Sequence, residues 1–383
     1  MDLRKDLLTR LSNGERMSDL CLEYGISRKT VYKFKERLER LGEAGLADLS
    51  RAPHVVPHRT PPAMVEVILA ARRKRPTWGS RKIKEVLERK GHRLPSHGAI
   101  ERILARAGLI TPKPRRNRSP ALTTAPVGRL IATAPHDVMC LDYKGQFRLG
   151  DQSFCYPLTI TDQATRYITA CESMAAISDA AARDVCQDVF RTWGLPRAIR
   201  SDNGVPFAST GLAGLTQLSA YFLRLGIALE RSRPGKPQDN GQHERMHRTL
   251  KAETTRPARA NLLQQQEVFD AWRHEFNHER PHQALGMKCP ADLFTVSPRP
   301  LPAQLPDLTY PLHDDAVRVS HYGDIHIAGY GNVRVTPALA GYFVGIREEL
   351  DGRWLITFCS LDLGFADGRR SVQPLTLDQE NPQ

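Results

Sequence analysis

A glutamate between two histidines one helical turn apart occurs in the stretch HERMH, from His243 to His247. This spacing fits H-E-x-x-H, in which two histidines on one helix face bind zinc and the glutamate acts as a base. The extension that adds a third histidine fails, because Leu250 and Glu253 stand where it has glycine and histidine. Glu267, 20 residues after His247, meets the spacing of another third ligand, so a zinc peptidase stays as one alternative.

Three acidic residues lie where separate secondary-structure elements are expected. Asp142 is in the expected strand LDYKG, Asp202 follows AIRS and opens the turn DNG, and Glu244 is in an expected helix. Carboxylates that meet at one edge of a sheet bind two divalent metal ions, which assist the attacking and leaving oxygens of a phosphodiester displacement. Carboxylate oxygens favour Mg²⁺ or Mn²⁺ over zinc. The alternative is that each acid only forms a cap or a turn.

Positive charge is concentrated in one segment. Residues 51–120 hold 18 Lys and Arg against 4 Asp and Glu, a net charge of +14 where the whole chain has +13. Such a segment favours a polyanion, above all a nucleic acid, as partner. No apolar run has the ~20 residues of a membrane span, and the N-terminus lacks an apolar signal region. Seven cysteines without a C-x-x-C pair agree with a reducing cytoplasm.

The N-terminal part predicts two helix-turn-helix units. In residues 15–41, helical apolar spacing flanks Gly25, which allows the turn, and Ser27, which caps the second helix. Residues 78–109 repeat the design, with a break at Gly91 and a cap at Ser96. A Pro- and Arg-rich linker follows over 111–127. The basic residues expected to contact DNA in these segments are Arg28, Lys29, Lys33, Arg81, Lys82, Arg115, Arg116 and Arg118. A plain helical hairpin with a solvated basic face is the alternative.

From about residue 135 the pattern becomes alternating strand and helix. Strands are expected over VMCLDYKG, FCYPLTITD, YITACESM, AIRSD and IALERS, and helices over 178–193, 212–225, 237–259 and 264–278. This order predicts a mixed sheet covered by helices. Residues 312–370 then show short strands with glycine-containing turns, which predict a small β-barrel or sandwich.

Five stretches together resemble bacterial insertion-sequence transposases with a retroviral-integrase-type catalytic core. They are PHDVMCLDYKG, TDQATRYI, WGLPRAIRSDNGVPF, LGIALERSRPGKPQDNGQHERMHRTLK and FNHERPHQALGMKCPADLF. The resemblance implies a ribonuclease-H-like α/β fold and a D, D, E triad of catalytic metal ligands at Asp142, Asp202 and Glu244. It also implies two Mg²⁺ or Mn²⁺ ions, and DNA contacts by Arg248 and Lys251 on the helix of Glu244.

We therefore expect a multidomain chain that acts as a DNA transposase, a polynucleotidyl transferase. The expected parts are helix-turn-helix domains at 1–55 and 56–110, a basic linker at 111–130, a ribonuclease-H-like core at 131–297 and a small β-barrel at 298–383. The protein would bind the terminal inverted repeats of its element, cleave the DNA, and join the ends to target DNA. Its partners would be double-stranded DNA and further copies of itself, in the bacterial cytoplasm at the nucleoid and not at a membrane. A catalytically inactive, transposase-derived DNA-binding regulator is the alternative.

The sequence also suggests roles for four further residues and for the two histidines of HERMH. Asp162 and Arg166 are expected to pair at a strand end, and Arg280 and His282 to pack or to contact a DNA backbone. His243 and His247 are expected beside the active site, either facing DNA or packed on the core.

Overall fold

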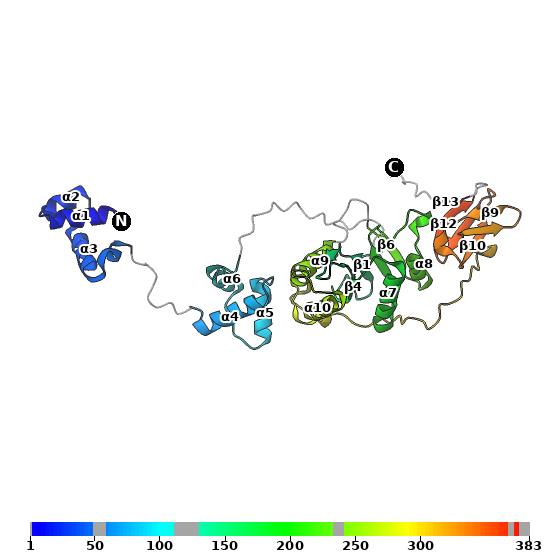
Figure 1. Cartoon of the computed structure of the whole chain (residues 1–383), viewed down its shortest axis with the longest axis horizontal. Helices are drawn as coiled ribbons and strands as arrows, with labels where there is room; N and C mark the ends of the chain where they lie inside the picture. The colour runs from blue at the N-terminus through cyan, green and yellow to red at the C-terminus, as the bar shows by residue number, and fades with distance from the viewer. Residues whose placement is uncertain (1, 49–58, 111–129, 233–240, 367–370, 375–383) are drawn as a thin grey trace. The chain divides into compact units, whose positions relative to one another are not determined.

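The chain forms two compact units, Met1–Pro61 and Pro62–Gln383. A computed structural model describes residues 2–48, 59–110, 130–232, 241–366 and 371–374, and the following account is restricted to them (Figure 1). Among the helices in these ranges, none is both long and apolar enough to span a membrane.

The first unit is a three-helix bundle with a helix-turn-helix. Its helices are α1 (Asp2–Ser12), α2 (Met17–Glu23) and α3 (Arg28–Leu41), followed by a 3-10 turn (Gly42–Leu46). Between α2 and α3, Gly25 has a φ of +62°, a value that glycine adopts without steric cost. The Ser27 side chain caps α3 by accepting the backbone N–H of Thr30. Leu20 and Val31 lie in the buried core, so the sequence-derived cap and turn at this unit are confirmed.

A second set of three helices begins the larger unit. These are α4 (Pro62–Lys74), α5 (Ser80–Arg89) and α6 (His97–Arg106). Trp78 and Ile83 are almost fully buried in their shared apolar core. Ser96 caps α6 by accepting the backbone N–H of Ala99, as expected from the sequence.

The central sheet joins parallel and antiparallel strands. Its main path runs β2-β3-β1-β5-β6, with β4 also pairing with β3. β3 is antiparallel to β1 and β4, whereas β1, β5 and β6 are parallel. The strands are β1 (Val138–Tyr143), β2 (Phe147–Arg148), β3 (Phe154–Asp162), β4 (Ile168–Met174), β5 (Ala198–Ser201) and β6 (Ala228–Arg231). The mixed sheet expected from the sequence is thus present.

Helices cover both faces of this sheet (Figure 1). On one face α7 (Asp179–Trp193) and α8 (Gln217–Arg224) pack on alternate residues of β1 and β3, such as Leu141 and Ile160. On the other face α9 (Gly241–Thr254) and α10 (Leu262–His274) bury Leu250 and Phe269, and a π-turn (Glu275–Glu279) continues α10. Because strand side chains alternate between faces, Cys140 and Asp142 of β1 point to the α9 side.

One expected helix is shorter than its apolar pattern. The range 212–225 holds a 3-10 turn (Leu212–Gly214) and then α8. Ala213 is left-handed, with a φ of +50°, which interrupts the helix. Thr216 and Ser219 form a capping box that starts α8 afresh.

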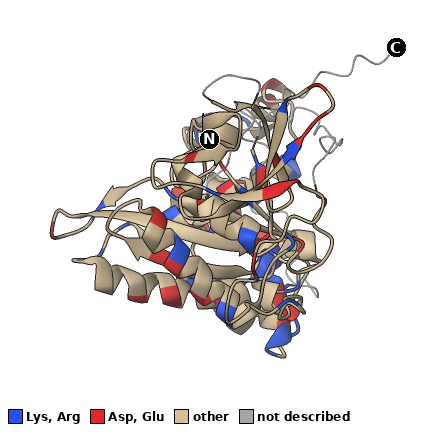
Figure 2. Cartoon of the chain, turned by 90° about the vertical axis from the view of Figure 1, so that its right-hand side faces the viewer, with Lys and Arg blue, Asp and Glu red and all other residues tan. Residues whose placement is uncertain are grey.

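The C-terminal segment is β-rich, but its strands do not form the expected closed barrel. One antiparallel sheet has the order β13-β12-β11-β10-β7, and β8 and β9 form a separate ribbon. Among the described residues its edge strands do not pair with each other, and closure requires that pairing. The strands are β7 (Asp315–Arg318), β8 (Asp324–Ile327), β9 (Gly331–Arg334), β10 (Phe343–Glu348), β11 (Trp354–Phe358), β12 (Leu361–Ala366) and β13 (Gln373–Pro374). Figure 2, which colours the whole chain by charge, shows basic and acidic residues interspersed along it.

The C-terminal core continues onto the central domain. Leu215 and Ala220, from the loop before α8 and from α8 itself, are buried together with Val344, Ile356 and Phe358 of the C-terminal sheet. α8 therefore lies between two apolar cores, since its Leu218 and Phe222 belong to the core under the central sheet.

Candidate active site

The position of Asp142 follows from the pairing of β1 with β3. Asp142 and Thr159 are directly opposite each other in this antiparallel pair. The Thr159 hydroxyl donates to the backbone oxygen of Asp142 at 3.1 Å. Both side chains therefore lie on the sheet face that α9 covers, with Asp142 only partly buried.

Asp202 reaches the same edge through the parallel pairing of β1 with β5. The pairing runs to Cys140 opposite Arg200, and each aspartate lies two residues further along the chain, Asp142 within β1 and Asp202 just after β5. Asp202 is exposed, and one carboxylate oxygen accepts the backbone N–H of Gly204 at 3.1 Å, within the DNG turn. The register of two neighbouring strands thus brings the two aspartates to one end of the sheet.

Glu244 is an exposed residue in the first turn of α9. Burial, followed by the charge of Asp202, raises the pKa of Asp142 to about 7, and the charge of Glu244 adds to the increase. Lys144 acts in the opposite direction. Asp142 therefore feels the negative charges of both Asp202 and Glu244, and a divalent cation is the natural counter-ion for such an acid.

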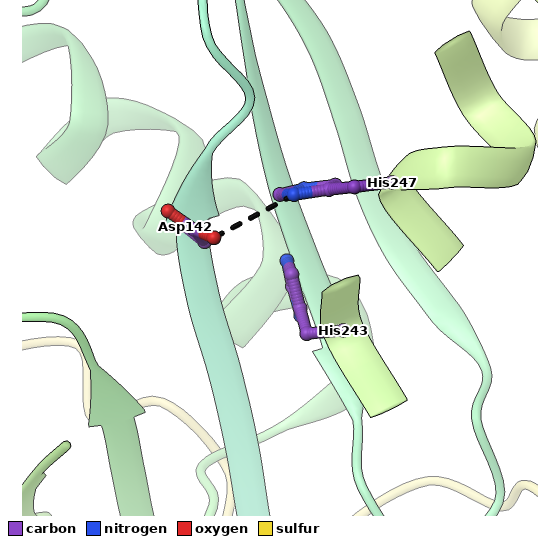
Figure 3. Close-up of side chains that lie close together, drawn as sticks. All are labelled: Asp142, His243 and His247. Carbon is purple, nitrogen blue, oxygen red and sulfur yellow. Dashed lines mark ion pairs between the residues drawn. The ribbon is translucent and has the colours of Figure 1, made fainter. Parts of the chain in front are cut away.

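The two histidines of HERMH lie beside Asp142, packed against β3 (Figure 3). The Nε2 atoms of His243 and His247 are each 2.7 Å from the Thr159 hydroxyl oxygen. That hydroxyl has one proton, which it donates to the Asp142 backbone, so both imidazoles donate Nε2–H to it. His243 Nδ1 then accepts the Thr161 hydroxyl at 2.9 Å. The expectation that these histidines pack on the core beside Asp142 holds.

The arrangement leaves one imidazole nitrogen directed at a carboxylate. His247 Nδ1 is 3.6 Å from Asp142 Oδ2, the contact dashed in Figure 3. Burial, with the nearby His243 and Lys144, lowers the pKa of His247 to about 2, so the ring is neutral and this contact is not an ion pair. Two acceptors then face each other, a geometry that a proton on Asp142 or a bound cation relieves. The site therefore fits a divalent cation at Asp142.

The zinc alternative requires both histidines to turn a free nitrogen to one ion. Asp142, His243 and His247 do present ligand atoms within 4.8 Å of one another, a cluster that the sequence did not reveal. Both nitrogens of His243, however, are engaged by Thr159 and Thr161. Glu267 is absent from the metal-ligand clusters found among the described residues. Zinc binding in the H-E-x-x-H manner would break hydrogen bonds that hold α9 on the sheet.

Burial of His243 predicts acid sensitivity of the core. Burial lowers the pKa of His243 to about 3 from 6.5. The unfolded chain therefore binds a proton first, and stability present above pH 6.5 is lost as the pH falls toward 3. We expect this histidine to contribute a slope of up to about 1.4 kcal/mol per pH unit within that window. Thermal unfolding of the wild type and of His243→Gln between pH 4 and 7 measures it, and equal pH dependence of both proteins would contradict the expectation.

The residues expected to contact DNA are mostly exposed. Arg28, Lys29 and Lys33 lie on the surface of α3, Arg81 on that of α5, and Arg248 and Lys251 on that of α9. Lys82 differs, because it is partly buried and lines a cavity with residues of the core. Arg115, Arg116 and Arg118 lie outside the described residues.

The prediction that the side chains of Asp162 and Arg166 pair with each other was wrong. The Asp162 carboxylate instead accepts three hydrogen bonds, from the hydroxyl and backbone N–H of Thr165 and from the backbone N–H of His136. Arg166 bonds to Asp162 only through its backbone N–H. The Arg166 side chain instead lines the same cavity as Lys82.

Comparisons with known proteins agree with this fold. Integrase core domain families match residues 132–237 and 225–290, a helix-turn-helix family matches 3–54, and a homeodomain-like family matches 30–104. The insertion element IS407 uncharacterized 31.7 kDa protein of Burkholderia multivorans is 26% identical over 254 residues, 64% of this chain and 87% of that protein. The insertion element IS476 uncharacterized 39.2 kDa protein of Xanthomonas euvesicatoria is 27% identical over 197 residues, 51% of this chain and 54% of that protein.

Among the solved structures similar to this chain is the simian T-cell lymphotropic virus intasome in complex with the PP2A regulatory subunit B56 gamma. Its matching chain is 15% identical, with 72% of this chain and 93% of that chain covered and a TM-score of 0.37. Because this score is below 0.5, the assignment depends on the sequence matches. Over residues 132–290 the chain is similar to integrase core domains. The resemblance of the chain to bacterial insertion-sequence transposases is thereby confirmed.

Proposed function

We propose that this protein is a DDE transposase that cleaves the ends of its insertion sequence and joins them to target DNA, with Asp142, Asp202 and Glu244 as metal ligands. The observation that carries the proposal is the parallel register that brings Asp142 and Asp202 to one sheet edge, beside α9 and Glu244. The raised pKa of Asp142, caused by burial and by its acidic neighbours, is what clustered metal ligands produce.

The three carboxylates would hold Mg²⁺ or Mn²⁺, the ions that oxygen ligands prefer, and we expect two ions in each site. When bound, these ions supply charge stabilisation for the attacking and leaving oxygens of phosphodiester displacement. Thr159 and His243 fix α9 on β3, which sets the position of Glu244 relative to Asp142. His247 is neutral and has its Nδ1 atom 3.6 Å from Asp142 Oδ2, so a cation held by Asp142 would relieve the contact between these two acceptors. The proposed reaction needs no nucleophilic side chain of the protein. Water attacks the phosphodiester first, and the DNA 3′-hydroxyl that this step releases then attacks the target DNA.

The N-terminal helices supply recognition in this proposal. The helix-turn-helix units bind the terminal inverted repeats, and α3 presents Arg28 and Lys29 at its exposed start, where such helices contact bases. Joining two element ends requires at least two copies of the chain on DNA. The test is to mix purified protein, labelled element ends and Mg²⁺ or Mn²⁺, and to measure nicking and strand transfer.

The alternative is a DNA-binding regulator derived from a transposase. It predicts tight binding of the element ends and neither nicking nor joining with either metal ion. The intact set of acids at one sheet edge favours the enzyme.

Lys251 tests the exposed face of α9. It lies two turns after Glu244 and is exposed, a placement suited to a DNA phosphate near the reacting bond. We expect Lys251→Ala to reduce end processing or strand transfer by about 10-fold, the equivalent of removing one ionic interaction worth ~1.4 kcal/mol. Circular dichroism should show an unchanged fold.

The matched control is Arg191→Ala, because Arg191 is an exposed residue of α7 on the opposite face of the sheet. Wild-type cleavage and joining by Lys251→Ala over a range of salt concentrations would show that Lys251 is only a solvated side chain.

A further inference from the structure

A cavity of about 350 Å³ lies between α5, α9, the end of β3 and the segment after the π-turn. Lys82, Arg166, Arg245, Arg280 and His282 line it, and His243 forms part of its wall. His243 also contacts Thr159 beside Asp142, so the cavity adjoins the proposed active site. Arg245 is exposed, which opens the cavity to solvent.

α5 is held against the integrase core by several polar contacts, so Lys82 has a defined place in this cavity. Arg75, in the turn that connects α4 to α5, pairs with Glu275 at 3.0 Å and also with Glu279. Arg89, at the end of α5, donates to the backbone oxygen of Met287 at 2.9 Å. The helix that carries Lys82 is thus anchored at its C-terminal end and through the turn that precedes it.

The basic side chains of the cavity are influenced more by one another's positive charge than by nearby acids. Burial, then the charges of Arg280 and Arg166, lowers the pKa of Lys82 to about 8, against an increase from Glu253. Burial and the charge of Arg245 lower the pKa of Arg166. Within the described part of the chain, no carboxylate forms an ion pair with Lys82, Arg166 or Arg245.

Two acids near these cations, Asp162 in the cavity lining and Glu253, which acts on Lys82, have other partners. Asp162 accepts its three hydrogen bonds from Thr165 and His136. Glu253 accepts both the Arg280 guanidinium at 2.9 Å and the Trp272 indole N–H at 2.7 Å. Arg280 is therefore neutralised by Glu253, while Lys82, Arg166 and Arg245 leave the cavity with an excess of positive charge.

His282 adds a buried polar atom without a partner. The residue is 8% exposed, and its Nε2 atom makes no hydrogen bond to the described residues. Its backbone N–H donates to the backbone oxygen of Lys288 at 3.0 Å, which fixes the ring beside Lys82 and Arg280. An unsatisfied buried nitrogen next to unpaired cations is expensive unless an anion or its hydration fills the space.

We propose that this cavity is a binding site for a phosphate group, contributed by the DNA backbone, with Lys82, Arg166 and Arg245 as its cationic ligands. Guanidinium and ammonium groups are the side chains that bind phosphate best, through charge-assisted hydrogen bonds. The identification of DNA as the source depends on the proposed function. The site links α5 of the second helix-turn-helix unit to α9, so a DNA strand seated there contacts the recognition part and the catalytic part at once.

The first experiment measures phosphate alone with the full chain. Inorganic phosphate at ten times its dissociation constant, at constant ionic strength, should raise the Tm of the wild type by about 2–4 °C. Arg166→Gln and Lys82→Gln should abolish this increase, whereas Arg191→Gln on α7 should retain it. Absence of an increase in the wild type, or its persistence in both cavity variants, would overturn the phosphate site.

The second experiment identifies the source of the phosphate. The slope of log K against log salt concentration for duplex element ends should become shallower in Arg166→Gln and in Lys82→Gln, by about 0.9 for each phosphate that the variant no longer neutralises. Arg245→Gln, which changes an exposed residue without risk to packing, should shift the slope in the same direction. If the cavity variants lose the effect of phosphate but keep the DNA slope, DNA as the source is wrong and a free phosphate compound is the ligand.

These measurements separate failure of the cavity from failure of the proposed function. Binding slopes require no cleavage, and nicking by the wild type is scored independently. A wild type that nicks DNA while the cavity variants bind it with an unchanged slope would overturn DNA as the source of the phosphate and leave the transposase proposal standing.

Discussion

Asp142→Asn, Asp202→Asn and Glu244→Gln should each reduce DNA nicking and joining by on the order of 10³-fold or more, while binding of the element ends survives. Each substitution removes one negative charge and keeps the shape of the side chain. The loss is expected because the proposed function assigns all three carboxylates to holding the divalent ions. Cleavage of labelled ends with Mg²⁺ and with Mn²⁺ measures it, and a gel-shift assay on the same samples measures binding.

Controls for this prediction come from the zinc alternative. Glu267→Gln should leave nicking and joining unchanged, and His243→Ala should lower stability more than chemistry, because His243 bonds to Thr159 and Thr161. Metal content by atomic spectroscopy completes the comparison. Stoichiometric zinc that disappears when either His243 or His247 is replaced would assign Glu244 to a different site and sink the transposase proposal.

Binding of the element ends should depend steeply on salt. If the chain neutralises six to ten phosphates, its affinity should fall by ~10³–10⁵-fold between 50 and 200 mM salt. The double variant Arg28→Gln, Lys29→Gln should lose preference for the element ends over unrelated DNA more than it loses binding to unrelated DNA. Both residues are exposed at the start of α3, where a helix-turn-helix contacts bases. Fluorescence anisotropy with both duplexes over this range of salt gives the two quantities.

Arg40→Gln provides the matched control, since Arg40 is an exposed residue at the other end of α3. It should weaken binding to both duplexes equally. Unchanged discrimination by the double variant would show that recognition lies outside α3.

Local signals in the sequence were sufficient for the caps, turns and strands. Ser27 and Ser96 precede helical apolar patterns, and both cap helices in the structure. The strands that carry or precede Asp142 and Asp202 were placed correctly because β-branched and apolar runs with nearby turn residues define them locally. These features depend on neighbours in sequence, which is why pattern reasoning found them.

Contacts between segments far apart in the chain could not be predicted from the sequence. Thr159 lies 84 residues from His243, and only the pairing of β3 with β1 places its hydroxyl under α9. The partners of Asp162 and the turn of Arg166 into the cavity depend likewise on tertiary packing. The closed C-terminal barrel is not confirmed by the structure, and the alternation of side chains in the sequence does not say whether edge strands pair.

The packing of α8 between two apolar cores determines what a truncated form of this protein would expose. Leu215 and Ala220 are buried by the C-terminal sheet, while Leu218 and Phe222 are buried under the central sheet. A nonsense mutation after residue 297 would therefore uncover an apolar face of α8 as well as delete a domain. The truncated product would be prone to aggregation and proteolysis. Genomic copies broken at this point should thus be silent, rather than producing a stable fragment that competes with intact protein at the element ends.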